Sequence, residues 1–245
     1  MTGALLAWRQ FRFERRLFWR NPSAAFFNFM LPLAFLLLVA SVFARGDRGR
    51  LEVLVPGIAG MAVMSTTFTA LAFNLTFLRE QGILKRMRGT PVPAGSYLGG
   101  LLGSSVLNAA VQVLLVVAIG HWLYGLPWPR EPLALAAFTA LGVLVFGALG
   151  VAFSHAIPNF DSAPAYVNAV FLPAIFISGV FYSASELPAP LEALAGTLPL
   201  KHVIDGLGGA IVTGQGPLEL PSATLTLLAW AAAGVTLAVW SFRWE

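Results

Sequence analysis

The chain has 245 residues, of which 58% are hydrophobic and only 11% are charged, and it carries a net charge of +4 with no cysteine. Soluble domains carry about 25% charged residues, so this composition indicates an integral membrane protein and argues against a soluble enzyme. The lack of cysteine excludes disulfides and thiolate metal sites, and the lack of Gly-Lys-Ser or Gly-Lys-Thr excludes a P-loop in this sequence. We interpret the excess of basic residues as topology signals and lipid contacts, with no nucleic-acid partner.

Arginines are concentrated in the first twenty residues. At 100° per residue, Arg9, Arg12, Arg16 and Arg20 fall within an arc of about 80°, which aromatic and leucine residues flank. We predict that residues 1–22 form an interfacial amphipathic helix that places these four arginines on anionic headgroups of the lipid bilayer. The alternative is a basic segment that only orients the first membrane span.

Six apolar segments follow, and each is long enough to cross a bilayer as a helix. We predict spans over residues 23–44, 53–78, 97–123, 133–156, 165–182 and 222–242. A short charged loop is expected over residues 45–52. With the N-terminus inside, the predicted cytoplasmic segments hold ten lysines and arginines and the outer segments hold five, which puts both termini in the cytoplasm. The expected fold class is a single all-α integral membrane domain over residues 1–245.

The most charged stretch between two spans is residues 79–91. Its charged residues are Arg79, Glu80, Lys85, Arg86 and Arg88. We predict one short helix over residues 80–88, which a glycine and then a proline terminate. Because this helix lies between two membrane-length segments, its charges must be outside the bilayer, and the lysine and arginine count puts it in the cytoplasm.

Residues 183–221 form a segment that is too long for a turn and too polar for a span. Within it, apolar residues recur at helical spacing from Leu200 to Ile211. We predict outer re-entrant helices that dip into the bilayer without crossing it and act as a gate or lid. An ordinary extracytoplasmic loop is the alternative.

The cores of the predicted spans hold no Asp, Glu, Lys or Arg, the residues that usually mark proton coupling inside a membrane. Neutral polar residues occur instead. Ser104, Asn108 and Gln112 share one face of the third span at a spacing of four, and Asn168 lies in the fifth span. They are expected to face the bundle or a wet cavity. This pattern is typical of an amphipathic substrate path, or of hydrogen bonds between helices worth about 0.6 kcal/mol each.

Two motifs and the topology together carry a family resemblance over nearly the whole chain. The first motif is Arg79-Glu80-x-Gly82-x-Leu84-Lys85-Arg86-x-Arg88-x-Thr90-Pro91. The second runs from Phe171-Leu172-Pro173 through Ile177-Ser178-Gly179-Val180-Phe181-Tyr182 to Asp205-Gly206-Leu207. They resemble the loop between spans 2 and 3, and the signature of span 5 and the outer loop, in membrane subunits of ABC-2 type exporters of the daunorubicin-resistance permease kind. Gly208 departs from the pattern, because many relatives carry arginine there.

The resemblance implies a permease subunit in a bacterial plasma (inner) membrane that exports a drug, lipid or lipid-linked saccharide. It implies a 2:2 complex with a separate ABC ATP-binding subunit and a second copy of the chain or a homologous permease. ATP and Mg would lie on the partner subunit, so this chain would hold no cofactor and would not itself be an enzyme. A self-contained facilitator or secondary transporter is the alternative.

The resemblance and the residue pattern together name two sets of candidate residues. The candidates for coupling to the ATPase, all within the expected coupling helix over 79–91, are Arg79, Glu80, Gly82, Leu84, Lys85, Arg86 and Arg88. The candidates for the substrate path or its gate are Ser104, Asn108, Gln112, Asn168, Phe171, Phe181 and Tyr182.

Overall fold

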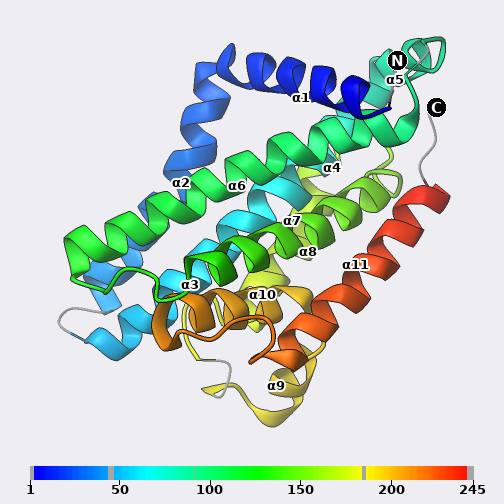
Figure 1. Cartoon of the computed structure of the whole chain (residues 1–245). Coiled ribbons are helices and arrows are strands. Elements are labelled where there is room, and N and C mark those ends of the chain that lie inside the picture. Colours follow the sequence, from blue (N-terminus) through cyan, green and yellow to red (C-terminus); the bar gives the residue numbers. More distant parts are fainter. Residues whose placement is uncertain (1–2, 44–46, 91, 184–185, 242–245) are drawn as a thin grey trace.

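The computed structural model describes residues 3–43, 47–90, 92–183 and 186–241, and these residues form helices and loops without a strand (Figure 1). The helices of the first half are α1 (Gly3–Trp19), α2 (Pro22–Phe43), α3 (Arg48–Met64), the π-helical turn η1 (Ser65–Thr69), α4 (Ala70–Glu80), α5 (Ile83–Arg88) and α6 (Ala94–Tyr124). Those of the second half are α7 (Pro132–Ser154), α8 (Ala163–Ile177), α9 (Ala189–Ala195), α10 (Pro199–Gly208), the π-helical turn η3 (Gly209–Thr213) and α11 (Pro221–Ser241). The predicted all-α class is confirmed.

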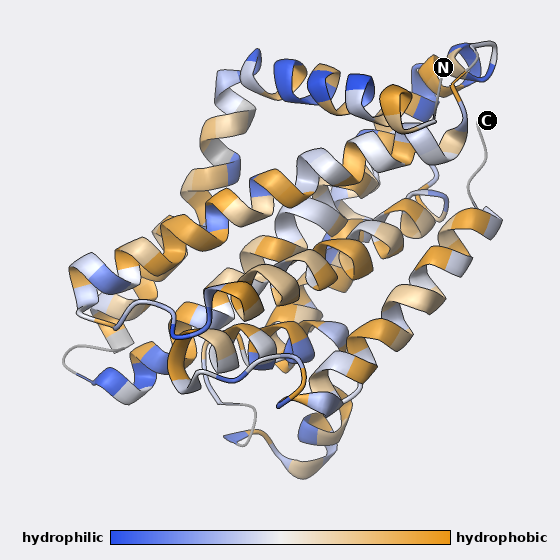
Figure 2. Ribbon diagram, viewed as in Figure 1, coloured by the Kyte–Doolittle hydropathy of each residue, from blue (hydrophilic) through white to orange (hydrophobic). Residues whose placement is uncertain are grey.

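Within the described residues, four helical segments are long and apolar enough to cross a membrane. They are the continuous helix from Arg48 to Glu80, α6, α7 and α11. The apolar stretch Asn28–Val42 of α2 and helix α8 are shorter. Figure 2 shows mainly hydrophobic residues along the long helices and hydrophilic residues in α1 and α5. Four spans are therefore supported by length and composition, while the count of six and the cytoplasmic termini stay predictions.

The first residues of α3 correct the predicted loop over 45–52, of which 45–46 lie outside the described residues. Asp47 is the N-cap of α3, because its Oδ1 accepts a hydrogen bond from the backbone N–H of Arg50 at 3.2 Å. Arg48 and Glu52 then pair across one turn at 3.1 Å. This cap and ion pair extend the helix into charged sequence that composition alone assigned to a loop.

The main core surrounds α3, which is buried from Leu54 to Met64 and packs against α6, α7 and α10. Two glycines permit close packing in this core, one between α3 and the turn after α8 and one between α10 and α7. A Cβ on Gly57 would lie 2.0 Å from the backbone oxygen of Val180, and one on Gly206 would lie 2.3 Å from the ring of Phe138. Helix α10 is consequently seated against the bundle rather than extended away from it.

The segment over 183–221 contains the helical pattern that the sequence predicted, apart from residues 184–185, which lie outside the described residues. The apolar residues of α10 and η3 that are buried include Leu200, Val203, Ile204, Leu207 and Ile211. They face α3, α7 and α11. The helical spacing is therefore confirmed, and its re-entrant position in a bilayer stays a prediction.

Helix α1 lies along the first half of α6 (Figure 1). A Cβ on Gly100 of α6 would lie 2.5 Å from the Cβ of Gln10 and 2.9 Å from the backbone nitrogen of Phe11, so a larger residue would separate the helices. Ser96 fixes the start of the contact, because its hydroxyl donates a hydrogen bond to the carbonyl of Gly3 at 3.0 Å. The N-terminal helix is thus attached to a membrane span by its inner face.

A widened turn interrupts the long helix between α3 and α4. In η1 the hydroxyl of Thr66 donates to the carbonyl of Ala62 at 2.7 Å, and that of Thr67 donates to the carbonyl of Val63 at 2.6 Å. The backbone of Phe68 lies so close to Gly150 of α7 that a Cβ there would be 2.8 Å from the Phe68 oxygen. Such π-helical turns accommodate one extra residue in an α-helix.

Candidate coupling region and cavities

The coupling segment is two helices rather than the single helix that the sequence predicted over 80–88. Helix α4 ends at Glu80, and Gly82 then adopts a left-handed conformation with a φ of +66°. An α-helix cannot continue through a positive φ, which glycine adopts without a steric penalty. Helix α5 starts after this turn and ends at Arg88, with Gly89 as its C-cap, as expected. Residue 91, at the end of the predicted segment, lies outside the described residues.

Helix α5 presents basic side chains from an apolar anchor. Leu84 is only 2% exposed and packs in an apolar cluster with residues of α4 and α6. Lys85, Arg86 and Arg88 are exposed. Arg86 also donates a hydrogen bond to the carbonyl of Gln81 at 3.4 Å, back across the turn. The short helix therefore combines a fixed position with a positively charged outer surface.

Arg79 and Glu80 bind a different part of the chain from the α5 cations. The guanidinium of Arg79 donates to the carbonyls of Ser154, at 2.9 Å, and Ile157. The carboxylate of Glu80 accepts a hydrogen bond from the backbone N–H of Phe160 at 2.6 Å. The seven coupling candidates thus form two groups. Arg79 and Glu80 contact the end of α7 and the loop between α7 and α8, and the other five lie in the turn after α4 and in α5.

A cavity of about 650 Å³ lies among α1, α2, α4 and α6. Its polar lining includes Glu14, Asn21, Asn28, Asn74, Ser104 and Asn108. Of the path candidates on α6, Ser104 and Asn108 line it, whereas Gln112 is buried and donates a hydrogen bond from its Nε2 to the backbone carbonyl of Asn28. The polar face of α6 therefore contributes both to a cavity and to a contact between helices.

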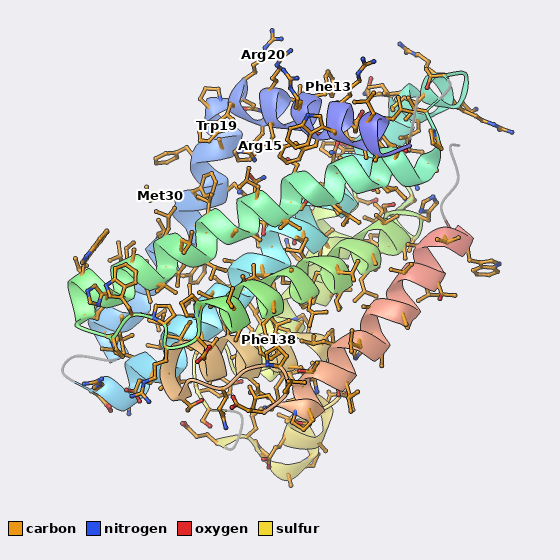
Figure 3. All side chains as sticks on the ribbon, viewed as in Figure 1. Phe13, Arg15, Trp19, Arg20, Met30 and Phe138 are labelled. Atoms are coloured by element: carbon orange, nitrogen blue, oxygen red, sulfur yellow. The ribbon has the colours of Figure 1, made fainter. Side chains whose placement is uncertain are left out.

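Two charged residues beside this cavity, Glu14 and Arg15, were missed by the sequence analysis. Arg15 donates to the side-chain oxygen of Asn108, and its guanidinium lies 5.3 Å from the ring centroid of Phe18 and 5.8 Å from that of Trp19. Figure 3 shows Arg15 on the side of α1 that faces α6 and Arg20 on the opposite side. One signal was available, because Arg15 is the only arginine of the first twenty residues outside the common arc.

Glu14 is a carboxyl group held on the inner side of α1. Burial raises the pKa of Glu14, and a hydrogen bond from the Gln10 amide at 2.7 Å partly opposes that increase. Burial also lowers the pKa of Arg15. In contrast, the four arginines that the sequence placed on the interfacial arc, Arg9, Arg12, Arg16 and Arg20, are all exposed. Helix α1 and the residue after it therefore carry four exposed arginines on the outer side, while Glu14 and Arg15 lie on the inner side, toward α6.

The remaining path candidates lie along α8 or in the turn that follows it. Phe181 and Tyr182 line a second cavity of about 770 Å³ together with Phe35 and Phe176. The ring centroid of Phe181 is 6.1 Å from that of Phe35 and 5.9 Å from that of Phe176. Phe171 packs half-buried against the main core.

Asn168 is exposed on α8, and neither of these cavities includes it among its lining residues. Of the seven path candidates, two line the first cavity and two line the second. Two more pack against neighbouring helices, and Asn168 is exposed.

Comparisons with known proteins place the chain in a family. The family model described as "ABC-2 type transporter" matches residues 4–212. The chain is 24% identical over 187 residues to the probable multidrug ABC transporter permease YbhS of Escherichia coli K12, an alignment that covers 75% of this chain and 49% of YbhS. It is 25% identical over 157 residues to the inner membrane transport permease YadH of the same strain, with 64% and 60% covered. For the probable multidrug permease YbhR, identity is 28% over 155 residues, with 62% and 41% covered.

The alignments span about half the length of these curated relatives. The family match begins in α1 and ends in η3, so it includes both the coupling segment and the outer helices. The long apolar helices and these relatives identify a multi-pass protein of the inner membrane. The chain belongs to the ABC-2 type transporter family.

Proposed function

We propose that this chain is the membrane-spanning permease subunit of an ATP-binding cassette exporter. The observation that carries the proposal is the exposed basic helix α5, which Leu84 anchors between two spans of a chain that belongs to a transporter family. A P-loop is absent from the sequence, which supports a separate subunit as the site of ATP and Mg binding. ATP-driven closure of that subunit would displace α5 and, through it, the spans.

The other elements take roles in the same mechanism. Helix α1 serves as the interfacial helix, with its exposed arginines on lipid headgroups, and α9 and α10 close the path on the outer side. The cavities lined by Ser104 and Asn108 and by Phe181 and Tyr182 contribute to the path. Their mixed polar and aromatic linings suit a hydrophobic or amphipathic substrate: a drug, a lipid or a lipid-linked saccharide.

Assembly follows from the same proposal. Two permease chains pair and each binds one ATP-binding subunit, which gives a 2:2 complex. The second chain is another copy or a homologous permease. Light scattering of the purified complex measures this ratio directly, and an active 1:1 complex would refute it.

Charge reversal in α5 tests the coupling role. If α5 binds the ATP-binding subunit through its positive charges, the double variant Lys85→Glu/Arg86→Glu should weaken that binding at least about tenfold. Arg130→Glu is the control, because Arg130 is an exposed arginine outside the coupling segment. Binding is measured by co-purification from nanodiscs, with permease-stimulated ATP hydrolysis as a second readout. Full binding and hydrolysis in the double variant would contradict the proposed function.

A further inference from the structure

The pair Arg79 and Glu80 holds a loop that is distant in the sequence. Arg79 donates to the carbonyls of Ser154 and Ile157, and Glu80 accepts from the N–H of Phe160. We call these three contacts the Arg79–Glu80 clamp. They join the end of α4, next to the proposed coupling helix, to the loop that leads from α7 into α8. Both side chains therefore make hydrogen bonds within this chain.

Packing around the clamp fixes the same two segments to each other. The ring centroid of Phe160 lies 5.4 Å from that of Phe77 and 6.3 Å from that of Phe73, both in edge-to-face geometry. The hydroxyl of Thr76 lies 3.5 Å from the Ser154 carbonyl. Five residues of α4, at positions 73, 76, 77, 79 and 80, thus contact the end of α7 or the loop that follows it. The end of α4 cannot move far without moving that loop.

The loop between the clamp and α8 is short and is closed by hydrogen bonds. The side-chain oxygen of Asn159 accepts from the N–H of Ser162 at 2.9 Å, and the Ser162 hydroxyl donates to the carbonyl of Asn159 at 3.0 Å. Helix α8 begins at the next residue, Ala163. Only a few residues therefore separate the clamp from α8.

The chemistry of the clamp explains the two residue types. The carbonyl of Ser154, the last residue of α7, lacks a partner within the helix and carries partial negative charge, which favours a cation beside it. Arginine presents a planar fork that reaches two acceptors at once, whereas lysine is a single point charge. Glu80 needs only an acceptor oxygen to hold the Phe160 N–H, and a neutral glutamine also supplies one.

We propose that Arg79 and Glu80 are positioning residues that join α4 to the α7–α8 loop, so that displacement of α5 is transmitted to α8. This inference rests on the proposed function, since it assigns the path by which the ATP-binding subunit would act. It changes the expected role of the first two coupling residues, which hold the moving parts together instead of forming the docking surface.

Hydrogen exchange in the permease alone tests the clamp without any partner. In nanodiscs, the amide of Phe160 should exchange at least about fivefold faster in Glu80→Ala than in the wild-type chain. Glu80→Gln should retain most of the protection. The amide of Ser162, held by Asn159 within the loop, is the internal reference. Equal exchange at Phe160 in Glu80→Ala and wild type would refute the clamp.

A labelling experiment in the complex with the ATP-binding subunit tests transmission to α8. The chain has no cysteine, so Ala165→Cys introduces the only thiol of the permease, on the exposed side of the first turns of α8. A cysteine-free ATP-binding subunit is used. The rate of labelling by a maleimide dye is compared with and without a non-hydrolysable ATP analogue. In the wild-type background the two rates should differ by at least about fivefold.

Substitutions in this background separate a clamp from a docking surface. Arg79→Lys keeps the positive charge but loses the planar guanidinium fork. The labelling rates with and without the ATP analogue should then differ by less than about twofold. Glu80→Gln loses the charge but keeps the acceptor, so the response should persist. If these residues instead formed a docking surface that depends on charge, Arg79→Lys should keep the response and Glu80→Gln should lose it. The control is the double variant Arg130→Lys/Glu131→Gln, the same dipeptide at exposed positions, which should leave the response unchanged.

The outcomes distinguish this inference from the proposed function. Arg79→Lys, Glu80→Gln and the control double variant should all leave binding of the ATP-binding subunit intact. The charge reversal in α5 should weaken that binding. A full response in Arg79→Lys, its loss in Glu80→Gln, or no response in the wild-type background would overturn the transmission path. Failure of the wild-type permease to bind an ATP-binding subunit would overturn the proposed function instead, and the exchange result at Phe160 would still test the clamp.

Discussion

The contact between α1 and α6 at Gly100 has no space for one added methyl group. In Gly100→Ala the new Cβ would lie 2.5 Å from the Cβ of Gln10 and 2.9 Å from the backbone nitrogen of Phe11. Carbon atoms pack best at about 3.5–4.0 Å, so α1 must move away by about 1 Å. Overpacking of this kind costs about 1–3 kcal/mol. We therefore expect Gly100→Ala to loosen the attachment of α1.

Two neighbouring glycines on α6 provide matched controls. A Cβ on Gly95 would meet nothing within 4 Å, and one on Gly99 would lie 3.8 Å from the Cβ of Ala7, an ordinary contact. All three changes gain up to about 1 kcal/mol of helix propensity, so the difference between Gly100→Ala and the controls isolates the steric cost. That difference should be about 1–3 kcal/mol in the free energy of unfolding.

The assay combines global and local measurements. Unfolding in mixed micelles by titration with SDS gives the free energy of each variant. Maleimide labelling of a cysteine at Leu6, on the half-buried side of α1, should be faster in Gly100→Ala than in either control. If Gly100→Ala unfolds and labels as Gly99→Ala does, the close contact between α1 and α6 is not a determinant of stability.

Two further predictions concern Glu14 and Gly82. Because burial raises the pKa of Glu14 above its usual 4.5, the folded chain binds this proton more tightly than the unfolded chain; the stabilisation is complete below pH about 4.5 and is lost as the pH rises through the raised pKa. Glu14→Gln should abolish that part of the pH dependence of unfolding and Glu131→Gln should not, and an unchanged profile in Glu14→Gln would refute the assignment. Gly82→Ala places a Cβ at a φ of +66° and should cost about 1 kcal/mol of unfolding free energy, while Gly82→Asn should cost less. Gly89→Ala, at a φ of −75°, is the control for this measurement, and equal effects at the two positions would contradict the role of the left-handed turn.

Composition and periodicity predicted the helices, because an apolar run of membrane length has few other stable structures. The bounds of α6, α7 and α11 lie within three residues of the predicted spans. The break at Gly82 was missed because glycine is tolerated inside many helices, and nothing local distinguishes a tolerated glycine from one with positive φ. The start of α3 was missed because an N-cap and an ion pair, rather than hydrophobicity, extend the helix to Arg48.

The candidate sites were predicted less completely than the helices. Spacing on one helix correctly grouped Ser104, Asn108 and Gln112 on the side of α6 that meets α1 and α2. It could not show that Arg79 and Glu80 bind carbonyl and amide groups 75–80 residues away, because tertiary partners leave no mark on local periodicity. The contacts of each side chain therefore required the fold, and the coupling role of the segment over 79–91 stays a prediction.

The widened turn η1 sets the rotational phase of everything that follows it in the long helix from Arg48 to Glu80. Each residue of an α-helix advances the side chains by 100°, so the extra residue that a π-helical turn accommodates shifts the phase of α4 relative to α3 by that angle. Deleting one residue within 65–69 would restore a regular helix and swing Arg79 and Glu80 away from the α7–α8 loop. Substitutions in η1 preserve that phase and deletions do not, so this part of the chain should accept changes of side chain far more readily than changes of length.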